Sequence, residues 1–260
     1  MKIKNVVLAV FVCLVFFACE VFAGVKIYPE VQRLVAPPGE TIKGNIWVIN
    51  SGDEKLEVEI QPEDWSKGRR KSSVAWLKIK QKQKKLIVKP KKMKEIKWKI
   101  VVPKDAEGDL IAQIFFASVS SEKTGGISIG TRVAQGIYVT VKGTEKPAGE
   151  IADFSVKCNN KNHGFAVLFK NTGNVQLTTK GEITLKELQT GTTRMLELDP
   201  YFYRPGASFT LWNWLPERLA EGDYESEATV FFADPSGMEQ STKSKFNFNV
   251  NNLGEITKRP

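Results

Sequence analysis

The stretch VPKDAEGD at residues 102–109, which runs into IFFA at 114–117, occurs in a related form further along the chain. The second copy is LPERLAEGD at 215–223, and it runs into VFFA at 230–233. Both copies lead from a proline through charged residues and a Gly-Asp pair into an apolar segment. This spacing is that of a whole domain and not of a solenoid repeat, so the pattern indicates two related domains.

A second pair of segments lies upstream of these copies and repeats in the same order. WVINSG at 47–52 and VLFKNTG at 167–173 are apolar runs that end in Asn-X-Gly. Corresponding positions are about 113 to 121 residues apart, which is the length of one domain. We therefore expect a duplicated scaffold.

Short apolar segments separated by turn residues predict strands throughout the chain, and no segment shows the sustained 3.6-residue periodicity of a helix. Seven or eight short strands in each half predict an all-β fold with two tandem immunoglobulin-like β-sandwich domains. In the first half we expect strands at 25–35, 42–50, 54–62, 75–80, 85–88, 93–102, 110–121 and 126–142. In the second half we expect them at 150–157, 164–171, 174–188, 193–198, 207–214, 223–233 and 239–250.

Residues 1–23 have the composition of a signal peptide. Lys2 and Lys4 precede an apolar run that is too short to span a bilayer comfortably. Val21 and Ala23 occupy the two positions that signal peptidase reads, so we expect cleavage before Gly24. No second long apolar run follows. We therefore expect export to the periplasm or another extracytoplasmic compartment, without a transmembrane span.

Lipoprotein processing at Cys19 is the competing interpretation, but Phe16 stands where the lipoprotein signal has a smaller aliphatic residue. We therefore expect the form without lipid. Cleavage before Gly24 removes Cys13 and Cys19 and leaves Cys158 as the one remaining thiol. Because one thiol cannot form an internal disulfide, both domains must be stabilised by core burial. Cys158 is expected to be structural, since no motif offers it a catalytic base.

By composition, the mature chain divides into a basic domain at 24–143, a linker at 144–149, a second domain at 150–250 and a tail at 251–260. The joint is polar and rich in Gly and Pro, as is typical of an interdomain linker. Residues 24–143 carry 23 Lys and Arg against 13 Asp and Glu, whereas residues 144–250 carry 11 against 14. The net positive charge of the mature chain therefore lies almost entirely in the first domain.

Eleven lysines lie between Lys78 and Lys99, and Glu95 is the only acidic residue among them. One interpretation is that they bind an anionic envelope polymer. The other is that they occupy the solvated faces of strands, because Lys97 and Lys99 alternate with apolar residues. No nucleic acid partner is expected, since the chain is exported and lacks the interleaved aromatic residues of a stacking platform.

The sequence offers no constellation for catalysis, for a metal or for a cofactor. His163 is the only histidine, and neither a nucleophile elbow nor a set of metal ligands at characteristic spacing accompanies it. We therefore expect a non-enzymatic protein without a cofactor. Trp212 and Trp214 share one face of a predicted strand, which suits either a sugar-stacking platform or ordinary sandwich packing.

Seven short segments follow one another in the first domain: GVKIY at 24–28, QRLV at 32–35, PGE at 38–40, VIN at 48–50, EDW at 63–65, GISI at 126–129 and GIYVTV at 136–141. Their order resembles the N-terminal domain of PapD-like periplasmic chaperones, which build pili and have two immunoglobulin-like domains. The resemblance covers residues 24–143, whereas residues 149–250 are similar only as the second sandwich of a tandem. Broader families of secreted sandwich proteins, including some that bind peptidoglycan, are also similar.

The resemblance implies a chaperone-like or scaffold protein that binds other exported or pilin-like proteins by β-strand pairing in pilus or surface-structure assembly. The pairing strand would be the last strand of the first domain, because main-chain bonds give affinity and alternate side chains fill pockets. Its alternating row consists of Ile127, Ile129, Val133, Ile137 and Val139. The last strand of any closed sandwich needs such a row as well.

In these chaperones, an Arg near the first strand and a Lys near the last strand anchor the C-terminal carboxylate of a partner. Arg33 matches the first position, so we expect it to lie in the cleft between the domains and to receive a carboxylate. Arg132 lies near the second position. The other interpretation is that Arg33 covers apolar surface or pairs with Glu30 or Glu40. The alternative function is a surface or cell-wall-binding module whose basic first domain binds an anionic polymer.

We predict that the exported protein begins at Gly24 and carries no lipid, because the residues before Gly24 fit signal peptidase better than those before Cys19 fit the lipoprotein signal. The intact mass of the exported protein measures this directly. A diacylglycerol-modified species that begins at Cys19 would contradict the prediction.

Overall fold

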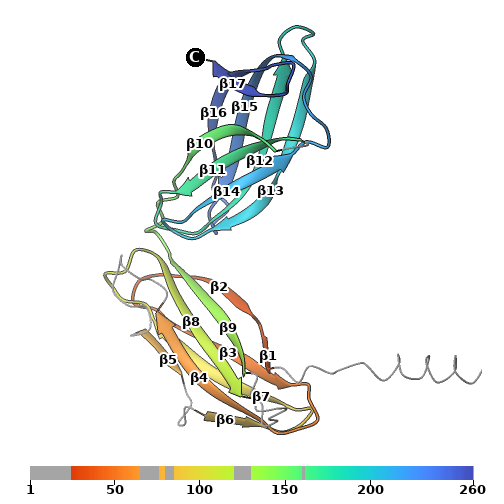
Figure 1. Ribbon diagram of the computed structural model, residues 1–260. Helices are drawn as coiled ribbons and strands as arrows, with labels where there is room; N and C mark the ends of the chain where they lie inside the picture. Colours follow the sequence, from red (N-terminus) through yellow and green to blue (C-terminus); the bar gives the residue numbers. More distant parts are fainter. Residues whose placement is uncertain (1–24, 65–75, 80–84, 120–129, 160–161, 260) are drawn as a thin grey trace, which may run out of the picture. The chain divides into compact units, whose positions relative to one another are not determined.

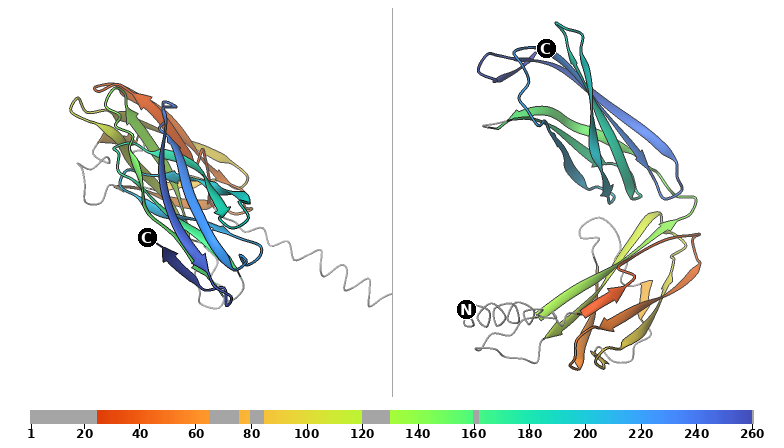
Figure 2. Two further views of the ribbon diagram at one scale, coloured as in Figure 1. Left: turned by 90° about the horizontal axis from the view of Figure 1, so that it is seen from above. Right: turned by 90° about the vertical axis from the view of Figure 1, so that its right-hand side faces the viewer.

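The computed structural model describes residues 25–64, 76–79, 85–119, 130–159 and 162–259, and in these residues the chain forms seventeen strands (Figure 1). The predicted all-β fold with two tandem sandwiches is confirmed. In each part of the chain the strands form two layers, which Figure 2 shows from two further directions. The expected signal peptide at 1–23 lies outside the described residues.

The internal contacts of the chain divide it into two compact units. The first holds the described residues up to Leu34 together with Gly39–Pro103 and Ile111–Tyr138. The second holds Val35–Pro38, Lys104–Leu110 and the residues from Val139 onward.

The N-terminal sandwich consists of one four-stranded sheet in the order β1-β3-β7-β5 and one five-stranded sheet in the order β2-β9-β8-β4-β6. Its strands are β1 (Val25–Tyr28), β2 (Val31–Ala36), β3 (Thr41–Asn50), β4 (Leu56–Asp64), β5 (Leu77–Ile79), β6 (Lys85–Val88), β7 (Met93–Val101), β8 (Gly108–Val119) and β9 (Gly130–Val141).

Alternation along β7 shows why these residues form strands. Ile96, Trp98 and Ile100 are buried, whereas Lys97 and Lys99 between them are exposed. A strand places successive side chains on opposite faces, so this pattern buries one face and solvates the other. The same rule places Ile46, Val58, Ile114 and Phe116 in the core, contributed by both sheets.

The single strand expected at 25–35 is in fact two strands that belong to different sheets. β1 pairs with β3 in antiparallel fashion, whereas β2 lies beside β9 in the other sheet. Pro29 stands between them, and its preceding peptide bond is cis. Because proline has no N–H, it cannot continue the ladder of β1.

The C-terminal sandwich consists of a three-stranded sheet in the order β10-β11-β14 and a five-stranded sheet in the order β13-β12-β15-β16-β17. Its core is rich in aromatic rings from both sheets, such as Phe165, Phe169 and Phe248, each fully buried. Its strands are β10 (Gly149–Cys158), β11 (His163–Asn171), β12 (Leu177–Glu187), β13 (Thr193–Tyr203), β14 (Ser208–Trp214), β15 (Gly222–Ala233), β16 (Glu239–Val250) and β17 (Ile256–Arg259).

Two strands of this sandwich differ from the sequence-based expectation: one is longer, and one lies where no strand was expected. β13 continues through Pro200 to Tyr203, which its position at the edge of the sheet allows. Residues 251–260, expected as a tail, contain β17, which pairs with β16 in antiparallel fashion.

The duplication seen in the sequence corresponds to equivalent strands in the two sandwiches. β8 and β15 each begin at a Gly-Asp pair and occupy the middle of a five-stranded sheet. Each is followed by a twelve-residue strand, β9 or β16, that lies beside it. β3 and β11, which end in the repeated Asn-X-Gly, both occupy inner positions of the opposite sheet.

The first copy of the repeated asparagine, Asn50, is buried at the end of β3, and its side chain forms hydrogen bonds with three parts of the chain. The side chain of Asn50 accepts a hydrogen bond from the Gly52 N–H at 3.0 Å through Oδ1. Its Nδ2 donates to the carbonyl oxygens of Glu54 at 2.7 Å and Val88 at 3.1 Å. Val88 is the last residue of β6, so the side chain joins a strand end, its turn and a distant strand.

Asn171 makes the equivalent three bonds at the end of β11. Oδ1 accepts from the Gly173 N–H at 2.9 Å, and Nδ2 donates to the carbonyl oxygens of Val175 at 2.8 Å and Tyr203 at 3.3 Å. Tyr203 is the last residue of β13. We call this arrangement the asparagine corner, and it occurs once in each sandwich.

We predict that Asn50→Ala and Asn171→Ala each lower the free energy of unfolding by about 2–4 kcal/mol, because each leaves buried backbone groups without a hydrogen-bond partner. Urea titration measures the loss. Thr172→Ala is the matched control, since Thr172 is the exposed neighbour of Asn171 and its loss should stay within about 0.5 kcal/mol. A loss below about 1 kcal/mol in both asparagine variants would contradict a structural role for the corner.

Candidate functional site

The last strand of the N-terminal sandwich, β9, is covered along only part of one edge. The N–H of Gly136 donates to the carbonyl oxygen of Glu30 at 3.0 Å, and the N–H of Lys142 donates to that of Ala36 at 2.9 Å. The residue numbers of the bonded partners increase in the same direction on both segments, so β2 runs parallel to β9. Its cover of β9 begins at Gly136. We call residues 130–135 the open half of β9.

The open half presents backbone hydrogen-bonding groups at its edge. Gly136 and Lys142 direct their N–H groups toward β2, and alternate residues of a strand point the same way. The N–H and C=O groups of Arg132 and Ala134 therefore point to the same edge. Within the described residues, β8 pairs with one edge of this stretch, and no strand pairs with the opposite edge, where β2 lies beside β9 only from Gly136 onward. An unpaired edge of this kind can accept an additional strand.

A buried glutamine marks the boundary between the two halves. Gln135 is fully buried, and its Nε2 donates to the carbonyl oxygen of Pro29 at 2.7 Å. Pro29 is the point at which the chain leaves β1 for β2, so this bond fixes where the cover of β9 begins. The Oε1 of Gln135 has no hydrogen-bond partner among the described residues.

The predicted row of apolar side chains on β9 is divided by this boundary. Ile137 and Val139 are fully buried in the core of their own sandwich. Val133 lies in the open half and is half-buried. Ile127 and Ile129 lie outside the described residues. Of the described members of the row, only Val133 is therefore placed where a partner strand would meet it.

The covered half of β9 is also held by a buried polar contact. Thr140 donates from Oγ1 to the Oδ1 of Asp109 on β8 at 2.7 Å, and both residues are buried. Burial raises the pKa of the Asp109 carboxyl, although the hydrogen bond from Thr140 opposes this effect. The covered half is thus tied into its sandwich by core packing and by a hydrogen bond.

Arg132 lies in the open half but points its side chain onto the outer face of the sheet. Its guanidinium group forms an ion pair with Glu63 of β4 and lies over the ring of Phe115 on β8, with Cζ 3.7 Å from the ring centroid. Stacking on an aromatic face and pairing with a carboxylate are both typical of arginine. The positive charge of Arg132 is therefore engaged within its own sheet.

Arg33 lies on β2, where it is exposed. Its Cζ lies 5.8 Å from the centroid of the Tyr138 ring on β9. Tyr138 and Arg132 are six residues apart on one strand, which is about 20 Å. The structure thus does not bring the two arginines together, and they cannot hold one carboxylate between them.

The single histidine and Cys158 both lie in the C-terminal sandwich, the first at the start of β11 and the second at the end of β10. His163 is fully buried, accepts from the Leu219 N–H at Nδ1 (3.0 Å) and therefore donates from Nε2 to the Gly254 carbonyl oxygen (2.8 Å). Cys158 is exposed, and its Sγ lies 3.2 Å from the carbonyl oxygen of Asn159. Among the described residues, no three His, Cys, Asp or Glu side chains gather to hold a metal ion. Across the residues that the structure describes, no helix is long and apolar enough to cross a membrane.

Sequence reasoning missed a row of lysines that crosses three strands. Lys43 on β3 lies opposite Lys99 on β7, which in turn lies opposite Lys78 on β5. All three are exposed, and none forms an ion pair with another described residue. Like charges placed directly opposite one another destabilise a sheet. The cross-strand register creates this row, and spacing along the sequence could not show it.

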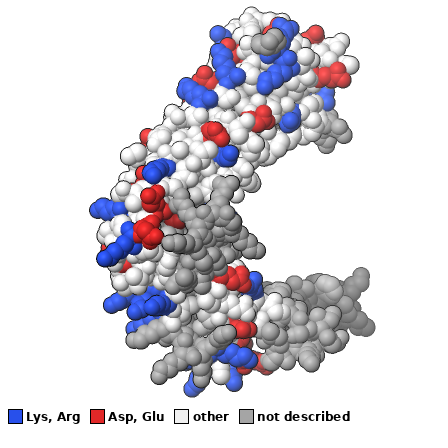
Figure 3. Space-filling model, turned by 90° about the vertical axis from the view of Figure 1, so that its left-hand side faces the viewer, with Lys and Arg blue, Asp and Glu red and all other residues white. Residues whose placement is uncertain are grey.

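Other lysines of the basic window are paired. Lys85, Lys91 and Lys97 lie 2.9, 3.0 and 3.4 Å from carboxylate oxygens of Glu57, Asp53 and Glu95, respectively. Figure 3 shows the same interspersion of the two charges over the face that it displays. The lysines of the three-lysine row therefore differ from these three, which each have a carboxylate partner.

The two neighbouring tryptophans of β14 are surface residues. Trp212 and Trp214 are 44% and 45% exposed, and their rings stack with centroids 5.5 Å apart. Gly164 opposite Trp214 leaves room for its ring, since a Cβ at Gly164 would come within 2.4 Å of it. The intervening Asn213 donates from Nδ2 to the Glu197 carbonyl oxygen at 2.8 Å.

The structure is similar to solved structures of fimbrial periplasmic chaperones. The YadV chaperone is similar with a TM-score of 0.46 and 9% identity, over 85% of this chain and 98% of that one. The class 5 fimbriae chaperone CfaA is similar with a TM-score of 0.46 and 16% identity, over 84% of this chain and 99% of that one. A structure of the Salmonella enterica SafA pilin in complex with the SafB chaperone is similar with a TM-score of 0.43 and 10% identity, over 87% of this chain and 96% of that one. No protein-family model and no curated protein matches the chain.

Proposed function

We propose that this chain is a non-catalytic periplasmic protein that binds other exported proteins by β-strand addition at the open half of β9. In this role it acts as a chaperone or scaffold in the assembly of pili or of a related surface structure. The observation that carries the proposal is that β2 covers β9 from Gly136 onward and that no strand among the described residues pairs with this edge of residues 130–135.

Three features of the open half suit an incoming strand. The backbone groups of Arg132 and Ala134 point outward, so they can form a ladder with a partner strand. Val133 is half-buried, and a partner's apolar side chain would complete its cover. The side chains of the covered half are buried in the core of the N-terminal sandwich, which holds β9 in place while the open half can pair with a partner strand.

We predict that Ala134→Pro abolishes partner recovery while the protein stays folded. Proline removes the N–H of residue 134, which points to the open edge and is not needed for the ladder with β8. The test is affinity purification of the exported protein from its own cells, followed by identification and quantification of the envelope proteins that accompany it. Thermal melting of the pure variant checks the fold.

Ala134→Ser is the matched control, because it changes the side chain and keeps the N–H. It should recover partners as well as the natural chain does. Val133→Pro removes an N–H that points to β8, so it should lower the melting temperature. Full partner recovery by a folded Ala134→Pro variant would overturn strand addition at this edge.

We further propose that Arg33 receives a partner's carboxylate, as the sequence resemblance implies. Its exposure on β2, next to Tyr138 in the covered half of β9, places Arg33 at the protein surface, and the planar fork of arginine suits a carboxylate. In the same recovery assay Arg33→Ala should weaken partner binding by about 2–5 kcal/mol with an unchanged melting temperature. Unchanged recovery would remove the anchor and leave strand addition standing.

A second candidate function, binding of an anionic envelope polymer, is favoured by one observation. The row of Lys43, Lys99 and Lys78 places three exposed cations side by side, and an anionic polymer would relieve their mutual repulsion.

We predict that retention on a dextran sulfate column falls smoothly as sodium chloride rises, because exposed charges are screened over about 8 Å at physiological salt. Lys43→Ala, Lys78→Ala and Lys99→Ala should each reduce retention by a similar amount, and Lys97→Ala, which removes a paired lysine, by less. Tight retention above about 0.5 M salt that a single substitution abolishes would indicate a shaped pocket instead.

A further inference from the structure

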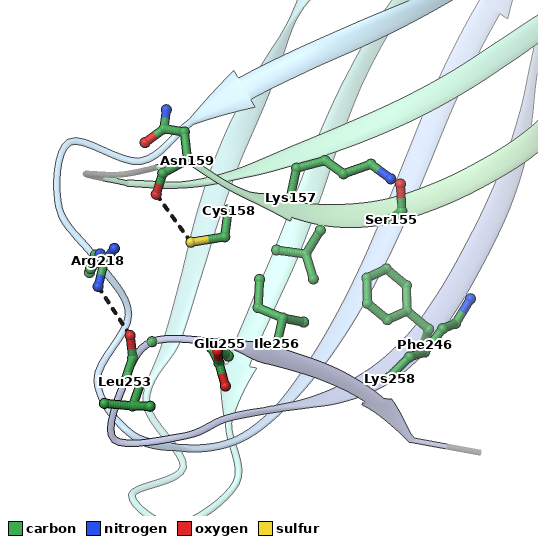
Figure 4. A pocket seen from close by; sticks show the side chains of 12 residues that line it. Ser155, Lys157, Cys158, Asn159, Arg218, Phe246, Leu253, Glu255, Ile256 and Lys258 are labelled. Atoms are coloured by element: carbon green, nitrogen blue, oxygen red, sulfur yellow. Dashed lines mark hydrogen bonds between the residues drawn. The ribbon is translucent and has the colours of Figure 1, made fainter.

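A groove opens along one side of the C-terminal sandwich, in a different unit from the open half of β9. Its volume is about 530 Å³, and its walls come from β10 on one side and from β17 with the preceding turn on the other (Figure 4). β10 ends the three-stranded sheet and β17 ends the five-stranded sheet. The groove is therefore bordered by two edge strands, whose outer backbone groups are available for pairing.

The floor of the groove is apolar. Phe246 is almost fully buried and packs against Phe154 with ring centroids 4.7 Å apart. Val156 and Ile256 are partly buried and pack against the same core. In Figure 4 the side chains of Ile256 and Phe246 lie in the space between the two walls. An occupant with apolar side chains would remove this floor from water.

The rim of the groove is positively charged. Its charged side chains are Lys157, Arg218 and Lys258 with a single carboxylate, Glu255. Glu255 is engaged locally, since its Oε2 accepts from the Nδ2 of Asn251 at 2.8 Å. The excess of cations favours an occupant with negative charge.

The wall formed by the turn before β17 is held by His163, which lies outside the groove, and by Arg218 on its rim. His163, fully buried, donates to the carbonyl oxygen of Gly254 at 2.8 Å. Arg218 donates to the carbonyl oxygen of Leu253 at 3.2 Å. Gly254 has φ +77°, a backbone conformation that favours glycine. The groove is thus preformed, and an occupant would not have to order its walls.

We propose that this groove binds an extended acidic peptide segment of a partner protein, in which apolar and acidic side chains alternate. The backbone of the segment lies along the β10 edge, from Ser155 to Asn159. Its apolar side chains cover Phe246 and Ile256, and its carboxylates meet Lys157, Arg218 and Lys258. An extended strand has this alternation by its geometry, and edge pairing supplies main-chain bonds.

The test is fluorescence anisotropy of a fluorescein-labelled (Glu-Val)4 peptide amide titrated with the purified protein. We expect saturable binding that Lys157→Glu weakens at least about tenfold, because it places a like charge opposite the peptide. Lys186→Glu on β12 is the matched control, since it reverses an exposed lysine outside the groove, and it should change affinity less than about twofold. Cys158→Trp fills the groove without changing its charge and should also abolish binding.

Several results would overturn the proposal. These are no binding of the peptide, equal binding of a (Lys-Val)4 peptide, or an equal loss in Lys157→Glu and Lys186→Glu, which would indicate general electrostatics. Displacement by free glutamate at the same carboxylate concentration would show a small-anion site and not a peptide groove. Ala134→Pro should leave peptide affinity unchanged, so this test and that of the open half of β9 fail or succeed separately.

Discussion

A buried asparagine side chain closes the same corner in both sandwiches, and the course of the surrounding strands depends on it. Asn50 and Asn171 each satisfy backbone groups in their own turn and at the end of a strand far away in sequence. A buried carbonyl group without a partner is costly, so the corner determines where the first strand ends and where the distant strand may end. The two sandwiches share this bonding pattern although most of the sequence around it differs between them.

In the N-terminal sandwich, the segment at 25–36 passes from one sheet to the other, as β1 and then β2. Pro29 cannot continue the ladder of β1, and after it the chain joins the other sheet as β2. The bond from Gln135 to Pro29 fixes that point. As a consequence β9 has two environments: Ile137 and Val139 fill a closed core, whereas no strand in the described part of the chain pairs with the outer edge of residues 130–135. The proposed function follows from this division of a single strand.

Much of the fold could be predicted from sequence, because alternation and turn residues act locally. The alternation around Trp98 located β7, and the expected segments correspond to nearly every strand. The break at Pro29 was missed because the sheet that β2 joins is decided by its pairing with the distant strand β9. The strand β17 was missed because its four residues are mostly polar and show no apolar alternation. The site was harder. Parity grouped Ile137 and Val139 on one face, but only the packing of the sandwich shows that both side chains are fully buried in its core.

The charged residues show the same limit. Arg132 pairs with Glu63, 69 residues away in sequence, and no local pattern indicates that contact. The row of Lys43, Lys99 and Lys78 and the groove beside Lys157 also arise from strands that the fold brings together. Sequence spacing gives the face on which such a side chain lies, and the register of the sheet gives its neighbours.

Residue-resolved amide hydrogen exchange along β9, with and without a recovered partner, tests the central claim most directly. In the free protein the amides of Gly136 and Lys142, which are bonded to β2, should exchange slowly, whereas those of Arg132 and Ala134 should exchange fast. Partner binding should slow Arg132 and Ala134 and leave the other two unchanged. Slow exchange of Arg132 and Ala134 in the free protein, or no change when the partner binds, would contradict an open edge that accepts a strand.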